Sequence, residues 1–383
     1  MFRNKYFRMK TKIALLSFIH SCNYGTLLQA FALAYKIKEM GCECEYLDFS
    51  KVRCNNKSLR RKLGGIKRKI INYFKPRGID DYSFWNSRLF SSVKNLCDTF
   101  INDYIPVNSN FNLHNLNESN KYYSRFVVGS DQTWSPYLIK DNSPFLLKFV
   151  EDNGKKMSYA PSLGTLNVPT TFQDVLQESL QSFNILTCRE RSNCSLLTRL
   201  ASKDVNYVVD PTLLLSKDEW ITISRPVEDM PEKYILCYIL GEKNCISKYA
   251  EDLGIQENIP VYYILTRPYY KNKKNVLKSV GPKEFVYLIS QASCVVTDSF
   301  HGTIFSINMG VPFYSFTKRE NRMAVHDNDR IKEILKEFDL LERFCEDDSN
   351  PDGVNAFNYS NIHFHLKELR EYSISILKEE VTL

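Results

Sequence analysis

The strongest constraint on the fold is the stretch of residues 294–310, which predicts a buried strand, a polar turn and a helix in immediate succession. The β-branched residues 295–297 favour a strand, and the small polar residues Asp298 and Ser299 offer side chains that can cap a helix. Gly310, with a proline two residues later, is typical of a helix stop. A strand that leads directly into a helix indicates an α/β fold, in which ligands bind at the carboxyl ends of the strands.

The chain begins with a strand–helix–strand pattern over residues 12–17, 25–41 and 44–49, which predicts a parallel sheet with a right-handed crossover. Alternating apolar runs continue this pattern through the chain. We expect further strands at residues 125–128, 234–240, 261–265, 294–297 and 312–316, and helices at 282–291, 331–341 and 364–378. The last two helices either complete the second half or cross back to the first.

A length of 383 residues predicts two domains, and a segment with two prolines between residues 216 and 233 suits a connection between them. We therefore predict an N-terminal domain of residues 1–215, with a basic insertion at 51–120, and a C-terminal domain of residues 216–383. The two domains would face a cleft.

Composition excludes several classes of protein. The chain has no apolar run of the ~18 residues that span a bilayer and no signal peptide, so we expect a cytoplasmic protein. Its 11 cysteines are scattered, which predicts small buried thiols and no metal site. The Gly-x-Gly-x-x-Gly fingerprint is missing from the first turn, which argues against a nicotinamide or flavin cofactor.

The net charge of +7 is concentrated in residues 57–77, which contain nine basic residues and no acidic one, interleaved with apolar side chains. Such a stretch can lie on an anionic membrane surface, and it can equally be the solvated face of a surface helix. No nucleic-acid motif accompanies it, so we expect no nucleic-acid partner.

His301 is the first candidate functional residue, because it lies in the first turn of the predicted helix that follows the strand. Free backbone N–H groups and the helix dipole attract anions to this place, so Ser299, His301 and Gly302 suit a phosphate or carboxylate ligand. From composition alone, a capping or half-buried histidine is the alternative interpretation. Ser299 is expected mainly as the helix cap, and Asp298 is either a base or a turn residue.

Other candidate residues follow the predicted strands of the first domain. Asn23 and Gly25 lie at the first turn, where they either hold an anion or form an Asx turn. Ser130 and Asp131 follow the strand at 125–128, where they either bind a ligand or cap a helix. Arg189 follows another strand, and it either binds an anion with its rigid fork or pairs with a carboxylate such as the glutamate next to it.

The ordered set of motifs resembles the polysaccharide pyruvyl transferase family. The motifs are NYGTLLQAFAL at residues 23–33, VGSDQTW at 128–134, CRERS at 188–192, DPTL at 210–213, TDSFHG at 297–302 and GVPF at 310–313. The resemblance implies two Rossmann-like domains, similar to the GT-B glycosyltransferase fold. It also implies transfer of pyruvate from phosphoenolpyruvate to a sugar as a ketal, with His301 as catalytic acid and Arg189 as donor-binding residue.

What the resemblance implies extends to partners. The acceptor would be a saccharide of a capsule or exopolysaccharide, carried on a lipid at the inner membrane face, and no cofactor would be needed. Two other functions stay open: a GT-B-like glycosyltransferase that uses a nucleotide sugar, and a non-catalytic anion-binding protein.

The sequence departs from the family at one position. Many members have Arg-Leu-His-Gly where this chain has Ser299-Phe-His-Gly, so a donor-binding cation that the family has is missing. Either another cation replaces it or the donor differs. The candidates for the replacement are Arg267, Lys318, Arg319 and Arg322.

Overall fold

The computed structural model describes residues 11–48, 87–241, 244–317, 321–346, 349, 353–355 and 358–382. Its first half is built on a parallel five-stranded sheet with the order β3-β2-β1-β4-β5. The strands are β1 (Lys12–Leu16), β2 (Glu43–Leu47), β3 (Val107–Asn108), β4 (Arg125–Val128) and β5 (Lys156–Ser158). A small parallel pair, β6 (Thr187–Cys188) and β7 (Asn206–Tyr207), lies beyond β5.

The second half is built on a parallel six-stranded sheet with the order β10-β9-β8-β11-β12-β13. Its strands are β8 (Ile235–Tyr238), β9 (Val261–Ile264), β10 (Val276–Leu277), β11 (Cys294–Thr297), β12 (Phe313–Phe316) and β13 (Phe344–Cys345). In each sheet the first three strands are added one after another towards one edge. The next strand pairs on the other side of the first strand, and later strands extend the sheet towards the opposite edge, which is the Rossmann order. The topology confirms the prediction of an α/β fold with two Rossmann-like domains. The predicted similarity to the GT-B glycosyltransferase fold is a similarity in this arrangement of two domains.

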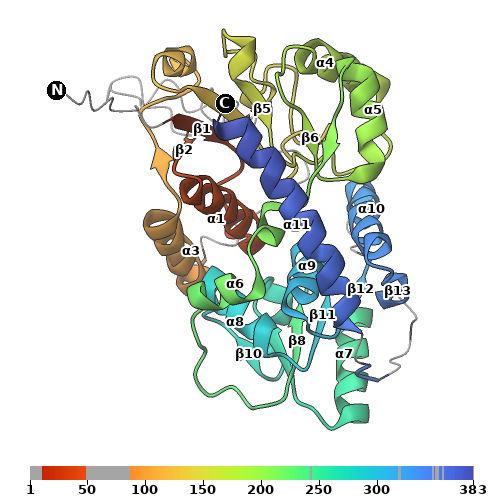
Figure 1. The fold of residues 1–383 in the computed structure, drawn as a ribbon. Coiled ribbons are helices and arrows are strands. Elements are labelled where there is room, and N and C mark those ends of the chain that lie inside the picture. Colours follow the sequence, from red (N-terminus) through yellow and green to blue (C-terminus); the bar gives the residue numbers. More distant parts are fainter. Residues whose placement is uncertain are drawn as a thin grey trace, which may run out of the picture.

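Helices cover both sheets (Figure 1). They are α1 (Tyr24–Glu39), α3 (Ser91–Tyr104), α4 (Thr170–Leu180), α5 (Arg191–Ala201), α6 (Lys217–Ile223), α7 (Asn244–Glu257), α8 (Pro282–Gln291), α9 (Phe300–Met309), α10 (Asn321–Glu337) and α11 (Tyr359–Thr382). Short 3₁₀ turns are η2 (Arg88–Phe90), η3 (Leu116–Lys121), η4 (Pro144–Leu146), η5 (Asn153–Lys155), η6 (Pro211–Leu213), η7 (Pro268–Asn272) and η8 (Leu341–Arg343).

Helix α1 lies between the two domains, which is why it is buried on nearly all sides. Its first residue, Tyr24, donates from its hydroxyl to the carbonyl of Val280 (2.8 Å), and its ring packs against Tyr238 and Phe285 of the second domain. One hydrophobic core therefore runs from α1 into the second sheet. This contact places the beginning of α1 beside the second domain.

The C-terminal helix α11 crosses back from the second domain to the first, as Figure 1 shows. Its Ser373 hydroxyl accepts the backbone N–H of Val209 (3.1 Å), and the Tyr372 hydroxyl bonds to Asn206 (3.1 Å). Of the two predicted courses for this helix, the return to the first domain is the one adopted. The proposed boundary at residues 215 and 216 lies between β7 and β8.

Most predicted elements form within a few residues of their expected bounds, and two differ. The segment 51–120 shows no regular strand pattern in the sequence, but its described part contains α3 and β3. Helix α3 has a short apolar face, buried at Val93, Cys97 and Phe100, which a search for long apolar runs overlooks. The helix expected at 331–341 begins at Asn321 and ends at Glu337.

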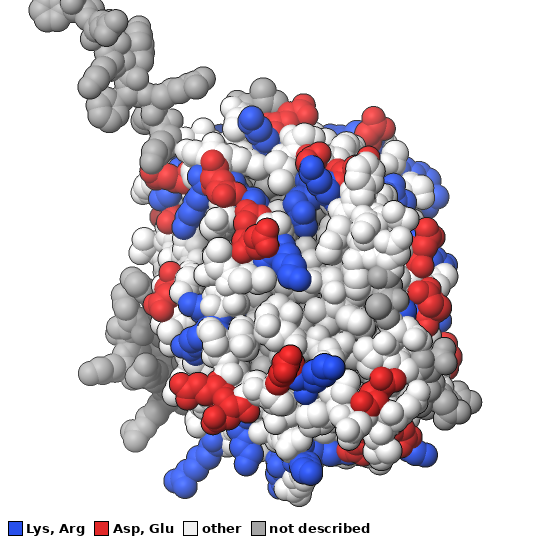
Figure 2. Space-filling view, turned by 60° about the horizontal axis from the view of Figure 1, so that its bottom comes forward, with Lys and Arg blue, Asp and Glu red and all other residues white. Residues whose placement is uncertain are grey.

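In the part of the chain that the structure describes, none of the helices combines the length and the apolar character that crossing a bilayer demands. On the face drawn in Figure 2, acidic and basic side chains are interspersed around a largely uncharged centre. The basic stretch 57–77 lies outside the described residues, so the predicted membrane contact stays a prediction.

Candidate active site

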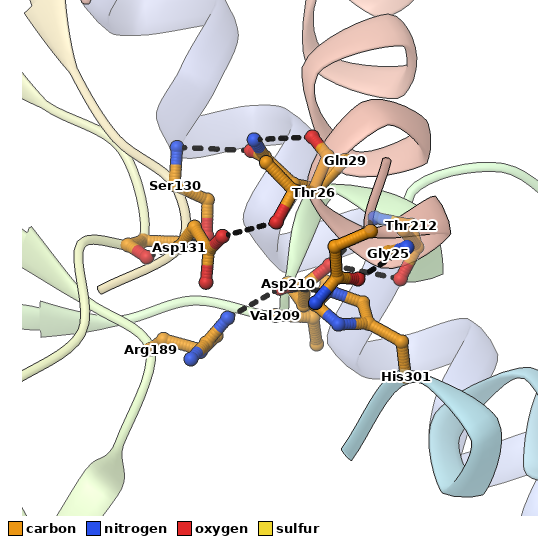
Figure 3. A network of polar contacts seen from close by, with 12 residues as sticks. Gly25, Thr26, Gln29, Ser130, Asp131, Arg189, Val209, Asp210, Thr212 and His301 are labelled. Atoms are coloured by element: carbon orange, nitrogen blue, oxygen red, sulfur yellow. Dashed lines mark hydrogen bonds and ion pairs between the residues drawn. The ribbon is translucent and has the colours of Figure 1, made fainter. Parts of the chain in front are cut away.

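Three segments that follow central strands meet between the domains (Figure 3). They are the beginning of α1 after β1, the turn after β4, and the beginning of α9 after β11. In each sheet this is the place where the strand order reverses, which is where open α/β sheets bind ligands. The topology therefore brings together most of the residues that the sequence indicated.

His301 lies directly against Gly25. A Cβ atom added to Gly25 would stand 2.1 Å from both Cγ and Nδ1 of His301, so the imidazole packs on the bare Cα. Gly25 itself donates its N–H to the side chain of Asn23 (3.0 Å), which caps α1. The Asx-type cap expected as one alternative for Asn23 is thus present, and it holds Gly25 in place beside the histidine.

Arg189 is buried and paired with two carboxylates. Its Nη1 donates to Oδ2 of Asp210 (2.8 Å) and its Nε donates to Oε1 of Glu190 (3.2 Å). Its Nη2 is also buried and has no hydrogen-bond partner among the described residues. The salt bridge expected as one alternative is therefore present, yet one end of the guanidinium fork keeps unused donors.

Asp210 joins Arg189 to the histidine, a role that sequence reasoning missed, since Asp210 stood out there only as part of the DPTL motif. Its Oδ2, which accepts from Arg189, lies 3.8 Å from Nε2 of His301. Its Oδ1 accepts the N–H and the hydroxyl of Thr212 (3.0 and 2.8 Å), which fixes the carboxylate at the start of η6. Burial would raise the pKa of Asp210, but His301, Arg189 and the bond from Thr212 outweigh it and leave the pKa below its ordinary value.

The pKa of His301 is lowered, chiefly because the ring is buried. Asp210 and Asp131 act in the opposite direction, while the charges of Arg189 and Arg330 lower the pKa further. The imidazole is therefore neutral at pH 7 in the ligand-free protein. Its Nε2 has no hydrogen-bond partner within the described ranges.

The turn after β4 is fastened to α1. Ser130 is fully buried, donates its hydroxyl to the carbonyl of Ala160 (2.7 Å), and donates its N–H to Gln29 (3.2 Å). Asp131 has a positive φ of 64° and accepts a hydrogen bond from Thr26 (2.8 Å). Of these two predicted residues, Asp131 joins the charged cluster around His301, whereas the hydroxyl of Ser130 is used inside the framework.

Ser299 caps α9, as expected, by accepting the N–H of Gly302 (3.3 Å). Gly302 is needed because a Cβ there would lie 2.4 Å from Oγ1 of Thr297 at the end of β11. Asp298 accepts the N–H groups of Leu240 and Gly241 (2.6 and 2.8 Å), which makes it a turn residue. These three residues therefore hold the histidine in position.

A pocket between the domains adjoins this cluster. It is lined by Arg189, Glu190, Tyr207, Asp210, Leu213, Phe300, Arg330, Glu333, Ile334 and Glu337. The first five come from the first domain and the rest from α9 and α10. His301 is not part of the lining and reaches the pocket through Asp210.

Of the four cations proposed to replace the family arginine, the structure describes the side chain of Arg267 alone. Arg267 donates to the carbonyl of Leu240 (2.7 Å) and does not line the pocket. Lys318 and Arg319, as well as the side chain of Arg322, lie outside the described residues. Arg330 is the second arginine that lines the pocket. Sequence reasoning missed it, because the pattern of its helix is that of a surface helix and does not indicate a ligand.

A family model described as polysaccharide pyruvyl transferase matches residues 23–318. The chain belongs to the polysaccharide pyruvyl transferase family. Membership makes it a transferase with a saccharide acceptor and a role in polysaccharide pyruvylation. The matched residues include Gly25, Arg189, Asp210 and His301, whereas Arg330 lies beyond them.

None of the curated proteins matches this chain. Solved structures similar to it include a glycosyltransferase from Rickettsia africae (TM-score 0.46, 10% identity, 97% of this chain and 94% of that one). They also include the UDP-GlcNAc 2-epimerase of Methanocaldococcus jannaschii (TM-score 0.49, 10% identity, 94% and 92%). A putative UDP-N-acetylglucosamine 2-epimerase from Listeria monocytogenes gives a TM-score of 0.49 at 12% identity, over 96% and 90% of the chains.

Within the described ranges, no group of three or more His, Cys, Asp and Glu side chains could hold a metal ion.

Proposed function

We propose that this protein transfers pyruvate from phosphoenolpyruvate to two hydroxyls of one sugar, forming a ketal during assembly of a capsule or exopolysaccharide. Family membership supports the transferase class. The observation that carries the choice of donor is the buried cluster of Arg189, Asp210 and His301. In it, Asp210 bonds to the guanidinium and lies 3.8 Å from the imidazole, while Nη2 of Arg189 has no hydrogen-bond partner among the described residues. Such a cluster suits a small polyanion.

The proposed reaction balances without a cofactor. One sugar hydroxyl adds to the enol carbon that carries the phosphate, and the neighbouring methylene carbon gains a proton and becomes a methyl group. The C–O bond to phosphate then breaks, and the second hydroxyl adds to the same carbon. Two hydroxyl protons are lost in total: the balance places one on the methyl group and the other on the released phosphate.

We assign the proton transfer to His301. An acid with a pKa near the working pH suits protonation of the methylene carbon, and histidine is the usual choice. Burial keeps His301 neutral in the free protein, so the scheme requires the donor to raise the pKa of the ring through its negative charges. In this scheme, donor binding and protonation of His301 are coupled.

We assign charge stabilisation to Arg189. Its Nη1 and Nε hold Asp210 and Glu190, which fixes the plane of the guanidinium, and its Nη2 has no partner in the described residues. A carboxylate or phosphate oxygen that accepted a hydrogen bond from Nη2 would satisfy this buried donor. The guanidinium would then stabilise the negative charge that develops on the leaving phosphate.

For the acceptor we propose a hexose on a lipid-linked intermediate at the inner face of the cytoplasmic membrane. The support comes from the basic and apolar residues 57–77, a composition that suits an anionic membrane surface. The protein would then work in the cytoplasm as a peripheral enzyme.

Purified protein incubated with each donor tests the proposal. Release of phosphate from phosphoenolpyruvate that depends on added acceptor is the expected result, and it should fall by roughly 10²–10⁴-fold in His301→Asn. Release of nucleotide from a nucleotide sugar instead would identify a glycosyltransferase. If neither donor is consumed and cells without the protein keep their polysaccharide pyruvate, measured by mass spectrometry, the enzyme proposal is wrong.

A further inference from the structure

One aromatic ring at the pocket contacts arginines from both domains. Phe300 is the first residue of α9, and its ring centroid lies 4.5 Å from Cζ of Arg189 and 5.3 Å from Cζ of Arg330. Both distances are within the ~6 Å reach of a cation–π contact. Arg330 is largely buried on α10, and it lines the same pocket as Arg189. The ring of Phe300 contacts both arginines.

The charges around the pocket require a second cation for an anionic ligand. Two carboxylates, Asp210 and Glu190, already balance Arg189. The other two carboxylates of the lining, Glu333 and Glu337, bond to residues of the first domain. The described lining holds four carboxylates and two arginines, so without Arg330 an anionic donor would meet four carboxylates and a single arginine.

The position of Arg330 is fixed by two contacts between α10 and the beginning of α5. Glu337 accepts two hydrogen bonds from Arg191 (3.0 and 3.1 Å), and Glu333 accepts the N–H and hydroxyl of Ser192 (2.7 and 2.6 Å). Arg191 and Ser192 follow Arg189 almost directly in the chain. Because α10 is fastened to the turn that carries Arg189, the two pocket arginines are held in a fixed relation across the domain boundary.

We propose that Arg330 binds an anionic group of the donor opposite Arg189, and that α10 supplies the second positive charge of the site. The inference rests on the proposed donor, phosphoenolpyruvate. Electrostatics agree with this position, since the charge of Arg330 is near enough to His301 to lower the pKa of its imidazole. A bound anion would offset that charge, so Arg330 also links donor binding to protonation of the histidine.

Isothermal titration with phosphoenolpyruvate tests the inference on the full-length protein. Arg330→Met removes the charge, and loss of a charge-assisted hydrogen bond should weaken donor binding by about 10- to 100-fold. Lys336→Met removes a positive charge from an exposed position on the same helix and should change the affinity by less than about two-fold. Steady-state kinetics should show a higher KM for the donor and an unchanged KM for the acceptor in Arg330→Met.

Inorganic phosphate and pyruvate, titrated separately, identify the group that Arg330 holds. Weaker binding of phosphate by Arg330→Met assigns the phosphate, and weaker binding of pyruvate assigns the carboxylate. If Arg330→Met does not fold, Arg330→Gln keeps a polar end group and loses only the charge, so it gives the same test.

The outcomes separate this inference from the proposed function. If the wild-type protein binds phosphoenolpyruvate and the neutral Arg330 variant binds it equally well, the inference is overturned and the proposed donor stands. If the wild-type protein does not bind phosphoenolpyruvate, the proposed donor is wrong and the inference is overturned with it.

Discussion

The imidazole of His301 rests on the Cα atom of Gly25, with no room for a Cβ between them. Gly25 belongs to the first domain and His301 to the second, so this contact joins the beginnings of two helices across the domain boundary. The position of the histidine is therefore set by a residue that lacks a side chain.

Gly25→Ala should displace the imidazole, because the new methyl group would overlap the ring. Overpacking in a buried site costs roughly 1–3 kcal/mol, and a shift of the histidine by about 1 Å should lower kcat by about 10²-fold. Chemical unfolding and acceptor-dependent phosphate release measure the two effects. Gly154→Ala, at an exposed turn with only a flexible carboxylate nearby, is the matched control and should behave as the wild type.

The pair of Arg189 and Asp210 should be strongly coupled in stability. Removing one partner leaves a buried charge, so Asp210→Ala and Arg189→Met should each destabilise the fold by about 3–5 kcal/mol, and the double variant by less than the sum. Urea unfolding of the four proteins gives the coupling energy. The exposed pair Lys367 and Glu371 on α11 is the control, for which about 0–1 kcal/mol is expected. Additive effects at Arg189 and Asp210 would contradict the buried ion pair.

Stability should fall with acidification partly because of His301. Its pKa in the folded protein lies below the ordinary value of 6.5, so below pH 6.5 the unfolded chain binds more protons than the native one. The free energy of unfolding should therefore decrease as the pH drops from 7 towards 5, and less steeply in His301→Asn. His363, whose pKa is also lowered by burial, contributes separately, so the slope should be reduced and not abolished. Equal slopes in the two proteins would argue against a neutral, buried His301.

Binding of phosphoenolpyruvate should be accompanied by proton uptake. In the proposed scheme the donor raises the pKa of His301, so affinity should weaken as the pH rises through the pKa of the bound complex. Calorimetry in two buffers of different ionisation enthalpy measures the protons taken up. The ligand's own phosphate also titrates near pH 6, so the informative quantity is the difference between the wild type and His301→Asn. No difference would remove the histidine from donor binding.

Ser299→Ala should act on stability more than on donor affinity, because the hydroxyl caps α9. Loss of an N-cap costs about 1 kcal/mol, and binding of phosphoenolpyruvate should change by less than about three-fold. Ser216→Ala, which removes the cap of α6, is the matched control for the stability effect. A loss of donor affinity at Ser299 alone would show that its hydroxyl contacts the ligand.

Local patterns in the sequence were sufficient for the elements that carry the site. Strand β11, the cap at Ser299 and the stop at Gly310 depend on side-chain volume, capping and backbone freedom within a few residues. The same local reasoning placed His301 at a helix beginning and Arg189 after a strand.

Only the tertiary structure decided which groups meet. In the sequence, Asp210 stood out only as part of the DPTL motif. Its bond to Arg189 and its approach to His301 bring together three segments that are distant in sequence. Arg330 lies on a helix whose local pattern indicates no ligand, and it reaches the pocket because carboxylates of α10 bond to the beginning of α5. Buried ion pairs and domain packing depend on long-range geometry, and local propensity contains no information about it.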